Sequence, residues 1–479
     1  MKAVTTDQIR QLDQRTIAAG TPGEELMERA GYAVAKTTAE LLKRRNSRSV
    51  VLFAGKCNNG GDAFVAARHL AGAGCAPTLV LLCRRDELTG DALTHFRKLV
   101  VVGVIEWPGE LPACDVVVDG LLGTGLQGDV REPYASAIKF LNSLRVPVVA
   151  IDVPSGLGTA TCVRGSVTVT MGLPKVDLLR PAAADCVGRI EVADLCYPPK
   201  FVDEIQTDVE LITRNDVVLP RRRRSAHKGE FGHLLIVAGS EGYTGAPVIC
   251  AHAAARTGAG LVTLAVPRAI YPIVAASCPP EVMPRPFDEL PSHDALAIGP
   301  GMGQKPETQK LIWRLLSNST VPAVVDADAL NALAQASAAI KKLPAPLVLT
   351  PHPGEMGRLV GKSAKEVQAN RWDIARSFAQ EYGLVTVLKG AGTVIADKSG
   401  KLWVNSTGNP GMAKGGTGDA LTGIIGAFLA QGLSPLDAAR AGVFVHGCAG
   451  DLACDRHGER SMLVSDLIAC LGAAFGTLD

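Results

Sequence analysis

The sequence predicts an α/β protein with two doubly wound domains, and three observations support that prediction. Short apolar runs rich in Val, Ile and Leu alternate with segments of helical periodicity, which indicates parallel sheets covered by helices on both faces. The chain has 479 residues, enough for two or three domains. Its 51 Gly and 29 Pro residues suit an architecture with many tight turns.

The first domain is expected from four buried strands, at residues 50–54, 78–82, 116–119 and 148–151. A break follows where Pro220 precedes the run of four arginines at 221–224. We place the boundary in this region, which gives domains at 1–215 and 216–479. The arginine run is interpreted as a solvated linker, because a nucleic-acid patch would be expected to interleave aromatic residues.

A second series of strands begins with HLLIVAG at 233–239 and is expected to end in an amphipathic helix after Asp419. Leu421, Ile424 and Phe428 fall on one face of that helix. Gly432 and the proline that follows it supply the stop signals. The two halves are therefore expected to share a layered α/β architecture, although no obvious sequence repeat relates them.

Charge and cysteine content exclude several classes of function. The 49 basic and 47 acidic residues nearly cancel, which argues against nucleic acid or an anionic membrane as the main partner. The first residues lack the apolar core of a signal peptide, and no run is long enough to span a bilayer. Twelve cysteines without a CxxC pair indicate free thiols. We therefore expect a cytoplasmic, soluble enzyme.

The most informative segment is GGTGDALTG at 415–423, a glycine-dense stretch at the start of a helix. Free backbone N–H groups and the helix dipole favour an anion there, and glycine lets a phosphate approach closely. Asp419 stands beside that expected phosphate. A carboxylate in this position is predicted to take the proton from a hydroxyl that attacks phosphorus. Helix capping is the alternative, because Asp is also a good N-cap.

Three other segments of this half could complete a phosphoryl-transfer centre. KGAGT, residues 389–393, joins two strands by a tight turn that could cover nucleotide phosphates, although a plain hairpin is the alternative. DADALN at 326–331 lies where a strand passes into a helix. TPHPGE at 350–355 places His352 in a loop held by two prolines. The GxxxxGK[ST] pattern is absent, so a P-loop nucleotidase is excluded.

In the first half, GKCNNGGD at 55–62 follows a strand and precedes a helical segment, which suits an anion site. GxGxxG is absent, so a hydride-transfer dehydrogenase is disfavoured, and an ordinary turn is the alternative. Two more strand ends carry DGLLGTGLQGD at 119–129 and DVPSG at 152–156. Because ligands collect at the carboxyl ends of parallel strands, these segments could converge. Their oxygen atoms suit potassium or magnesium, whereas each carboxylate alone could be a cap or turn former.

The sequence resembles a known family over nearly its whole length. GGTGD with KGAGT resembles the ribokinase-like superfamily, in which this aspartate activates the acceptor hydroxyl. HKGEFGHLLIVAGS (227–240), YTGAPVICAHAAARTGAGLVTL (243–264), IGPGMG, DADALN and TPHPGEMGRL look like the ADP/ATP-dependent NAD(P)H-hydrate dehydratase. ELMERAG (25–31), NNGGD, DGLLGTGLQGD and IDVPSG look like the NAD(P)H-hydrate epimerase. The resemblance implies a Rossmann-like three-layer sandwich for the epimerase domain, followed by a ribokinase-like dehydratase domain.

For the second domain, the resemblance implies phosphorylation of the C6 hydroxyl of hydrated NAD(P)H, after which phosphate leaves and restores the ring. Asp419 would be the catalytic base. ADP or ATP, with Mg²⁺, would be held by Lys389, Gly390, Ala391, Gly392, Thr393 and Gly418. The hydrate would contact Ala246, Gly303, His352 and Asp419.

For the first domain, the resemblance implies interconversion of the R and S hydrates, with Asp152 as a catalytic residue near the reacting carbon. The substrate would be bound by Asn58, Asn59, Gly60, Gly61, Asp62, Gly123, Thr124, Gly125, Leu126, Gln127, Gly128, Asp129 and Asp152. Potassium would be held by Asn59, Asp119 and Ser155. The chain departs from the family at 55–57, where GKC replaces the usual Gly-Pro-Gly, and in a shortened segment after Gly156.

Hydrated NADH or NADPH and ADP or ATP are thus the expected small-molecule partners, and a homo-oligomer is expected. The rival hypothesis is a ribokinase-like kinase of a vitamin-precursor alcohol, with the first half as a non-catalytic binding module. Such a kinase would release a stable phosphoester, whereas the repair reaction releases free phosphate.

Overall fold

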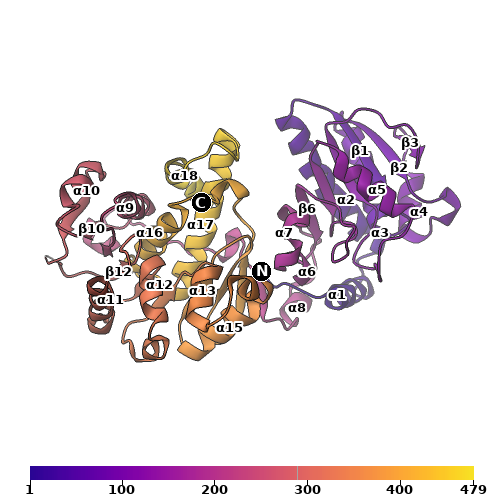
Figure 1. Cartoon of the computed structure of the whole chain (residues 1–479). Coiled ribbons are helices and arrows are strands. Elements are labelled where there is room, and N and C mark those ends of the chain that lie inside the picture. Colours follow the sequence, from indigo (N-terminus) through magenta and orange to yellow (C-terminus); the bar gives the residue numbers. More distant parts are fainter. Residues whose placement is uncertain (289, 479) are drawn as a thin grey trace. The chain divides into compact units, whose positions relative to one another are not determined.

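The computed structural model describes residues 1–288 and 290–478, and within them the chain forms two compact units, Met1–Thr207 and Asp208–Asp479 (Figure 1). The second unit starts with strand β8 (Val209–Leu211), which pairs with β17 (Leu402–Asn405). The second unit therefore begins ahead of the boundary at 215/216 that was expected from the sequence.

The first unit contains a seven-stranded sheet in the order β3-β2-β1-β4-β5-β6-β7, with every neighbouring pair parallel. Its order reverses between β1 and β4, so this point is where a ligand crevice is expected. The strands are β1 (Ser49–Ala54), β2 (Ala76–Leu81), β3 (Gly103–Glu106), β4 (Val116–Gly120), β5 (Val148–Ile151), β6 (Val167–Met171) and β7 (Arg189–Ala193).

Helices cover both faces of this sheet. Alternate residues of β1 point to opposite sides, so Val50 and Leu52 join the core under α2 and α3, whereas Val51 and Phe53 join the core under α5. The helices are α1 (Thr6–Ala18), α2 (Gly23–Arg44), α3 (Asn58–Gly72), α4 (Gly90–Arg97), α5 (Tyr134–Ser143), α6 (Val176–Leu179), α7 (Ala184–Val187) and α8 (Pro199–Asp203). The three-layer, doubly wound prediction is confirmed.

The second unit contains a ten-stranded sheet in the order β11-β10-β9-β12-β13-β14-β15-β16-β17-β8. It is mixed, because β16 runs antiparallel to both β15 and β17. A tight turn joins β15 to β16, as the KGAGT segment predicted. The remaining strands are β9 (His233–Val237), β10 (Leu261–Val266), β11 (Val282–Pro286), β12 (Ala295–Ile298), β13 (Ala323–Val325), β14 (Leu347–Leu349), β15 (Val385–Leu388) and β16 (Thr393–Ala396).

Helix α16 (Thr417–Ala430) is the centre of the second unit, and its residues 420–430 are all buried. It packs closely on α9 (Gly245–Thr257): a Cβ on Gly423 would lie 2.1 Å from the carbonyl oxygen of Cys250, so only glycine fits there. The other helices are α10 (Tyr271–Ser277), α11 (Pro306–Asn318), α12 (Ala327–Ala334), α13 (Pro353–Val360), α14 (Ala364–Ala369), α15 (Arg371–Tyr382), α17 (Pro435–His457) and α18 (Val464–Gly476).

Two helices begin earlier than the sequence suggested. NNGGD lies in the first turns of α3, which starts at Asn58, and TGD forms the first turn of α16, which starts at Thr417. Glycine is tolerated there because the first N–H groups of a helix have no partner within it and can face a ligand. Among the helices described, none is long and apolar enough to cross a membrane.

Candidate active sites

In the first unit, Asn59 ties the start of α3 to two neighbouring strand ends. Its side-chain amide donates to the carbonyl oxygens of Leu122, at 3.1 Å, and Ile151, at 2.8 Å. The turn before α3 is equally close-packed: a Cβ on Gly60 would lie 1.9 Å from the carbonyl oxygen of Gly55. The structure therefore brings NNGGD together with the ends of β4 and β5, as the sequence predicted.

Asp119 and Ser155 form a buried pair beside Asn59. The Ser155 backbone N–H donates to one oxygen of Asp119 at 2.8 Å, and the Ser155 hydroxyl donates to the other at 2.6 Å. Asp119 is fully buried, and burial raises its pKa to about 6. Among the described residues no basic side chain forms an ion pair with it. The set thus offers hard oxygen atoms and an uncompensated carboxyl group, which suits a bound cation.

Asp152 follows β5 with φ 63°, a left-handed conformation that non-glycine residues adopt only at a cost. Its carboxylate forms an ion pair with Lys175, and the backbone N–H of Met171 donates to it at 3.1 Å. Lys175 is only 2% exposed and also donates to the carbonyl oxygen of Met171 at 2.9 Å. Lys175 was not predicted from the sequence, where its only signal is a position a few residues after an apolar strand.

Two further carboxyl groups share this environment. Asp62, in the first turns of α3, is buried, and burial followed by the charge of Asp152 raises its pKa well above the usual value. Asp13 of α1 accepts a hydrogen bond of 2.5 Å from the hydroxyl of Tyr197, and burial raises the pKa of Asp13. The sequence analysis also missed Asp13 and Tyr197. Three acids therefore surround Lys175.

The segment 123–129 is only partly brought to this cluster. Gly123 lies against Asn59, because a Cβ there would be 2.7 Å from its Oδ1 atom. Thr124 accepts a hydrogen bond from Arg10 at 3.4 Å. Residues 127–129 are exposed, and Asn58 is exposed as well. Lys56, where the chain departs from the family pattern, is exposed 3.6 Å from a carboxylate oxygen of Glu87.

In the second unit, Asp326 joins the KGAGT turn to helix α16. The amino group of Lys389 donates to its Oδ1 atom at 2.5 Å, and the hydroxyl of Thr422 donates to its Oδ2 atom at 2.7 Å. The Oε2 atom of Glu355 lies 3.8 Å from the Lys389 amino group. Burial disfavours the charged form of Lys389, but the two carboxylates outweigh burial and raise its pKa. Lys389 is thus a fixed positive charge.

Asp419 lies in the first turn of α16 rather than at its N-cap, which is Gly416 with φ 92° and no side-chain cap. The capping alternative is therefore wrong. Burial, and then the charge of Asp326, raises the pKa of Asp419 to about 6. A Cβ on Gly418 would lie 3.3 Å from the Lys389 amino group. The acid, the lysine and the free helix start are thus close together.

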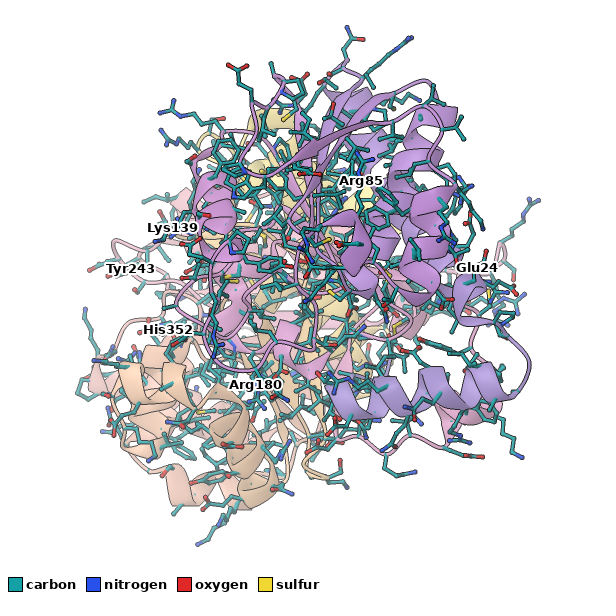
Figure 2. All side chains as sticks on the ribbon, turned by 90° about the vertical axis from the view of Figure 1, so that its right-hand side faces the viewer. Glu24, Arg85, Lys139, Arg180, Tyr243 and His352 are labelled. Carbon is teal, nitrogen blue, oxygen red and sulfur yellow. The ribbon has the colours of Figure 1, made fainter. Side chains whose placement is uncertain are left out.

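His352, labelled in Figure 2, is the N-cap of α13. Its Nδ1 atom accepts from the backbone N–H groups of Gly354, at 2.9 Å, and Glu355, at 3.2 Å. Burial and the nearby Lys389 lower its pKa, so its imidazole is neutral at pH 7. The half-exposed ring therefore has a structural role and still presents an edge to solvent.

Ala246 and Gly303 lie on neighbouring segments. A Cβ on Gly301 would be 3.1 Å from the Cβ of Ala246, and the backbone N–H of Gly303 donates to Asp328 at 2.8 Å. The charge of Asp328 also raises the pKa of Asp419. The predicted substrate contacts and the predicted base therefore occupy one region.

Two supports of this site were missed from the sequence. Arg371, 1% exposed, donates to the carbonyl oxygens of Leu388, at 2.8 Å, and Lys389, at 3.1 Å, and burial lowers its pKa to about 10. His446 donates from Nε2 to the carbonyl oxygen of Thr417 at 3.0 Å, and burial lowers its pKa to about 4. Neither residue lies in a motif, so only the structure reveals these contacts.

Comparisons with known proteins find relatives for both halves of the chain. A family model described as NAD(P)H-hydrate dehydratase matches residues 234–472, and one described as YjeF-related protein N-terminus matches 23–176. The bifunctional NAD(P)H-hydrate repair enzyme Nnr of Moorella thermoacetica is 41% identical, with 98% of this chain and 95% of that protein covered. Its namesake from Escherichia coli is 36% identical, with 93% and 88% covered.

A solved structure is similar to the second unit. The ADP/ATP-dependent NAD(P)H-hydrate dehydratase of Bacillus subtilis, co-crystallised with ATP and Mg²⁺, is 32% identical with a TM-score of 0.52, and the match covers 57% of this chain and 100% of that one. Together with the two-domain relatives, this match leaves no half of the chain unassigned. The chain belongs to the family of bifunctional NAD(P)H-hydrate repair enzymes.

Proposed function

We propose that this protein repairs hydrated NAD(P)H in two steps. Its first unit interconverts the R and S hydrates, and its second unit converts the S hydrate back to NAD(P)H at the expense of ADP or ATP. The observation that carries the proposal is the arrangement of Asp419, Lys389 and the free start of α16 within a chain that matches the bifunctional family from end to end.

In the second unit, Asp419 takes the proton of the C6 hydroxyl while that oxygen attacks the terminal phosphorus of the nucleotide. The first N–H groups of α16, including that of Gly418, face the negative charge that develops on the phosphoryl oxygens, and Lys389 adds a positive charge. Phosphate then leaves C6 while the neighbouring ring carbon loses a proton, which restores the double bond. General-base catalysis of this kind contributes roughly 10²–10⁴-fold to a rate.

The other contacts follow from the position of each element. The turn 389–393 covers the nucleotide phosphates, and Arg371 holds that turn in place through its bonds to the carbonyl oxygens of Leu388 and Lys389. Ala246, Gly303 and the exposed edge of His352 contact the hydrate. The imidazole of His352 would contact the hydrate through a hydrogen bond and would not neutralise a charge on it.

Magnesium would neutralise the transferring phosphoryl group. The described residues contain no group of three or more His, Cys, Asp or Glu side chains placed to hold a metal ion. Mg²⁺ usually keeps several waters and binds through substrate phosphates with few protein ligands. We therefore expect it to enter together with the nucleotide, and the Bacillus subtilis relative was co-crystallised with both.

In the first unit, the hydrate binds over residues 58–62 and 123–129 with its reacting carbon near Asp152. Asn59, Asp119 and Ser155 would hold K⁺. These donors suit K⁺ for two reasons. Among the described residues Asp119 is buried without a cationic partner, and the Oδ1 atom of Asn59 accepts no hydrogen bond from any of them. The cation would neutralise this carboxylate and fix the two loops around it.

The test is incubation of the purified protein with NADH hydrate and either ADP or ATP. Return of the dihydronicotinamide absorbance together with free phosphate supports repair. A stable phosphoester of the hydrate, or no return with either nucleotide, would refute it and favour the kinase alternative. Supplying pure R hydrate tests the epimerase, and Asp152→Ala should leave the R form unused while the S form is still repaired.

A further inference from the structure

We propose that Asp62 and Asp152 are the acid and the base of the epimerase reaction, and that Lys175 holds the carboxylate of Asp152 in place. This inference rests on the proposed epimerase function of the first unit and assigns the proton transfers within it.

The fold places the two carboxyl groups at one edge of the sheet. The hydrogen bond from Asn59 to the carbonyl oxygen of Ile151, 2.8 Å long, fastens the first turn of α3 to the residue that precedes Asp152. Asp62 lies three residues after Asn59 and therefore on the same face of α3. The negative charge of Asp152 raises the pKa of Asp62, which agrees with this proximity.

Asp62 has the environment of a proton donor. It is 6% exposed, and among the residues that the structure describes its carboxyl group has no hydrogen-bond or ion-pair partner. Burial, and then the negative charges of Asp152 and Asp13, raise the pKa of Asp62 against the opposing charge of Lys175, which favours the protonated carboxyl group. A buried carboxyl group without a partner destabilises the fold, so its presence indicates a functional role.

Asp152 has the opposite environment. The ammonium group of Lys175 contacts its carboxylate, and the N–H of Met171 donates to the same oxygen. Lys175 is held in turn by the Met171 carbonyl and by the hydroxyl of Thr170, at 3.3 Å. The positive φ of Asp152 and the burial of the ion pair are both costly, and such costs gather at functional sites. Two carboxyl groups in contrasting environments are a recognised acid and base arrangement.

The reaction balances with these groups alone. The proton of Asp62 passes to the C6 hydroxyl, the C6–O bond breaks, water departs, and the ring nitrogen lone pair forms a C=N bond to C6. Water then adds to the opposite face of C6, its proton passes to Asp152, and the C=N electrons return to nitrogen. Transfer of that proton from Asp152 back to Asp62 resets the site. Only the configuration at C6 changes.

The experiment compares Asp62→Asn, Asp62→Glu and Lys175→Met in the full chain, with exposed Asp185→Asn as the matched control. Each is supplied with pure R or pure S hydrate and excess ATP. Use of S reports an intact second unit, and use of R, corrected for spontaneous epimerisation, reports the epimerase. We expect Asp62→Asn to lower the rate on R at least about 100-fold, with S unchanged and partial activity in Asp62→Glu.

The pH profile separates chemistry from structure. The wild-type rate on R should have an alkaline limb, where Asp62 loses its proton. Lys175→Met should lower the rate on R and leave S unchanged, because the carboxylate of Asp152 loses the cation that holds it. Full use of R by Asp62→Asn or by Lys175→Met would overturn the assignment. Absence of R use in the wild type would instead refute the epimerase function itself.

Discussion

In the proposed mechanism Asp419 must be ionised to accept the hydroxyl proton, so acid should inactivate the dehydratase. With a pKa of about 6, about nine tenths of Asp419 is ionised at pH 7 and about one tenth at pH 5. The rate constant kcat/KM for the S hydrate should therefore fall about 10-fold between these values, with half of the loss near pH 6. The assay is the return of dihydronicotinamide absorbance at low concentrations of both substrates, so that the free enzyme is titrated.

Asp326→Asn tests the physical cause of that midpoint. After burial, the charge of Asp326 is the larger of two nearby negative charges that raise the pKa of Asp419, so its neutralisation should move the acid limb to lower pH. The same change removes the charged partner of Lys389, so the plateau at neutral pH should fall as well. Asp373→Asn, on the exposed side of α15, is the matched control and should leave the profile in place. A limb that stays put or moves to higher pH in Asp326→Asn would refute the reasoning.

Three more predictions follow from the packing of the second unit. The folded state raises the pKa of Asp419 above its unfolded value near 3.8. The stability contributed by the protonated Asp419 is therefore fully present below pH 3.8 and is lost as the pH rises through about 6. Asp419→Asn should therefore abolish repair of the S hydrate. It should also raise the free energy of unfolding at pH 7, measured by denaturant titration, by on the order of 1–3 kcal/mol, and a less stable variant would contradict this. Gly423→Ala should destabilise the second unit by about 1–3 kcal/mol, because the added Cβ clashes with Cys250. Gly472→Ala, with open space around it, should stabilise the unit by up to about 1 kcal/mol in the same titration, and equal effects would contradict the packing argument. Arg371→Met should raise the KM for ATP more than it lowers kcat, because the turn that we propose to cover the phosphates loses its support; an unchanged KM would show that the turn does not contact the nucleotide.

Much of the fold could be predicted because its signals are local. Continuous apolar runs at β1, β4 and β5 predicted buried parallel strands, and the glycine segments predicted helix starts that face a ligand. Boundaries were less predictable: NNGGD and TGD lie inside the first turns of α3 and α16, whereas the sequence placed them ahead of these helices. Glycine weakens a helix, and in these turns close packing outweighs that propensity.

Residues that act through burial were not predictable in the same way. Lys175 and Arg371 carry no motif, and a lysine or arginine in a sequence is usually exposed. Their importance comes from contacts with Asp152 and with the KGAGT turn, made after the chain has buried them. Asp62 stood in a predicted site, but its lack of a partner could be seen only in the folded chain.

The sequence by itself determined two layered α/β domains, a glycine-rich segment with Asp419 at the start of a helix, and a resemblance that covers both halves. Those features depend on residue type and spacing along the chain, which any unfolded copy already contains. The tertiary structure alone decided which charges meet: Asp326 with Lys389 and Thr422, and Asp152 with Lys175. The physical reason is that pKa values and ion pairs depend on distance and burial in three dimensions, which sequence separation does not encode.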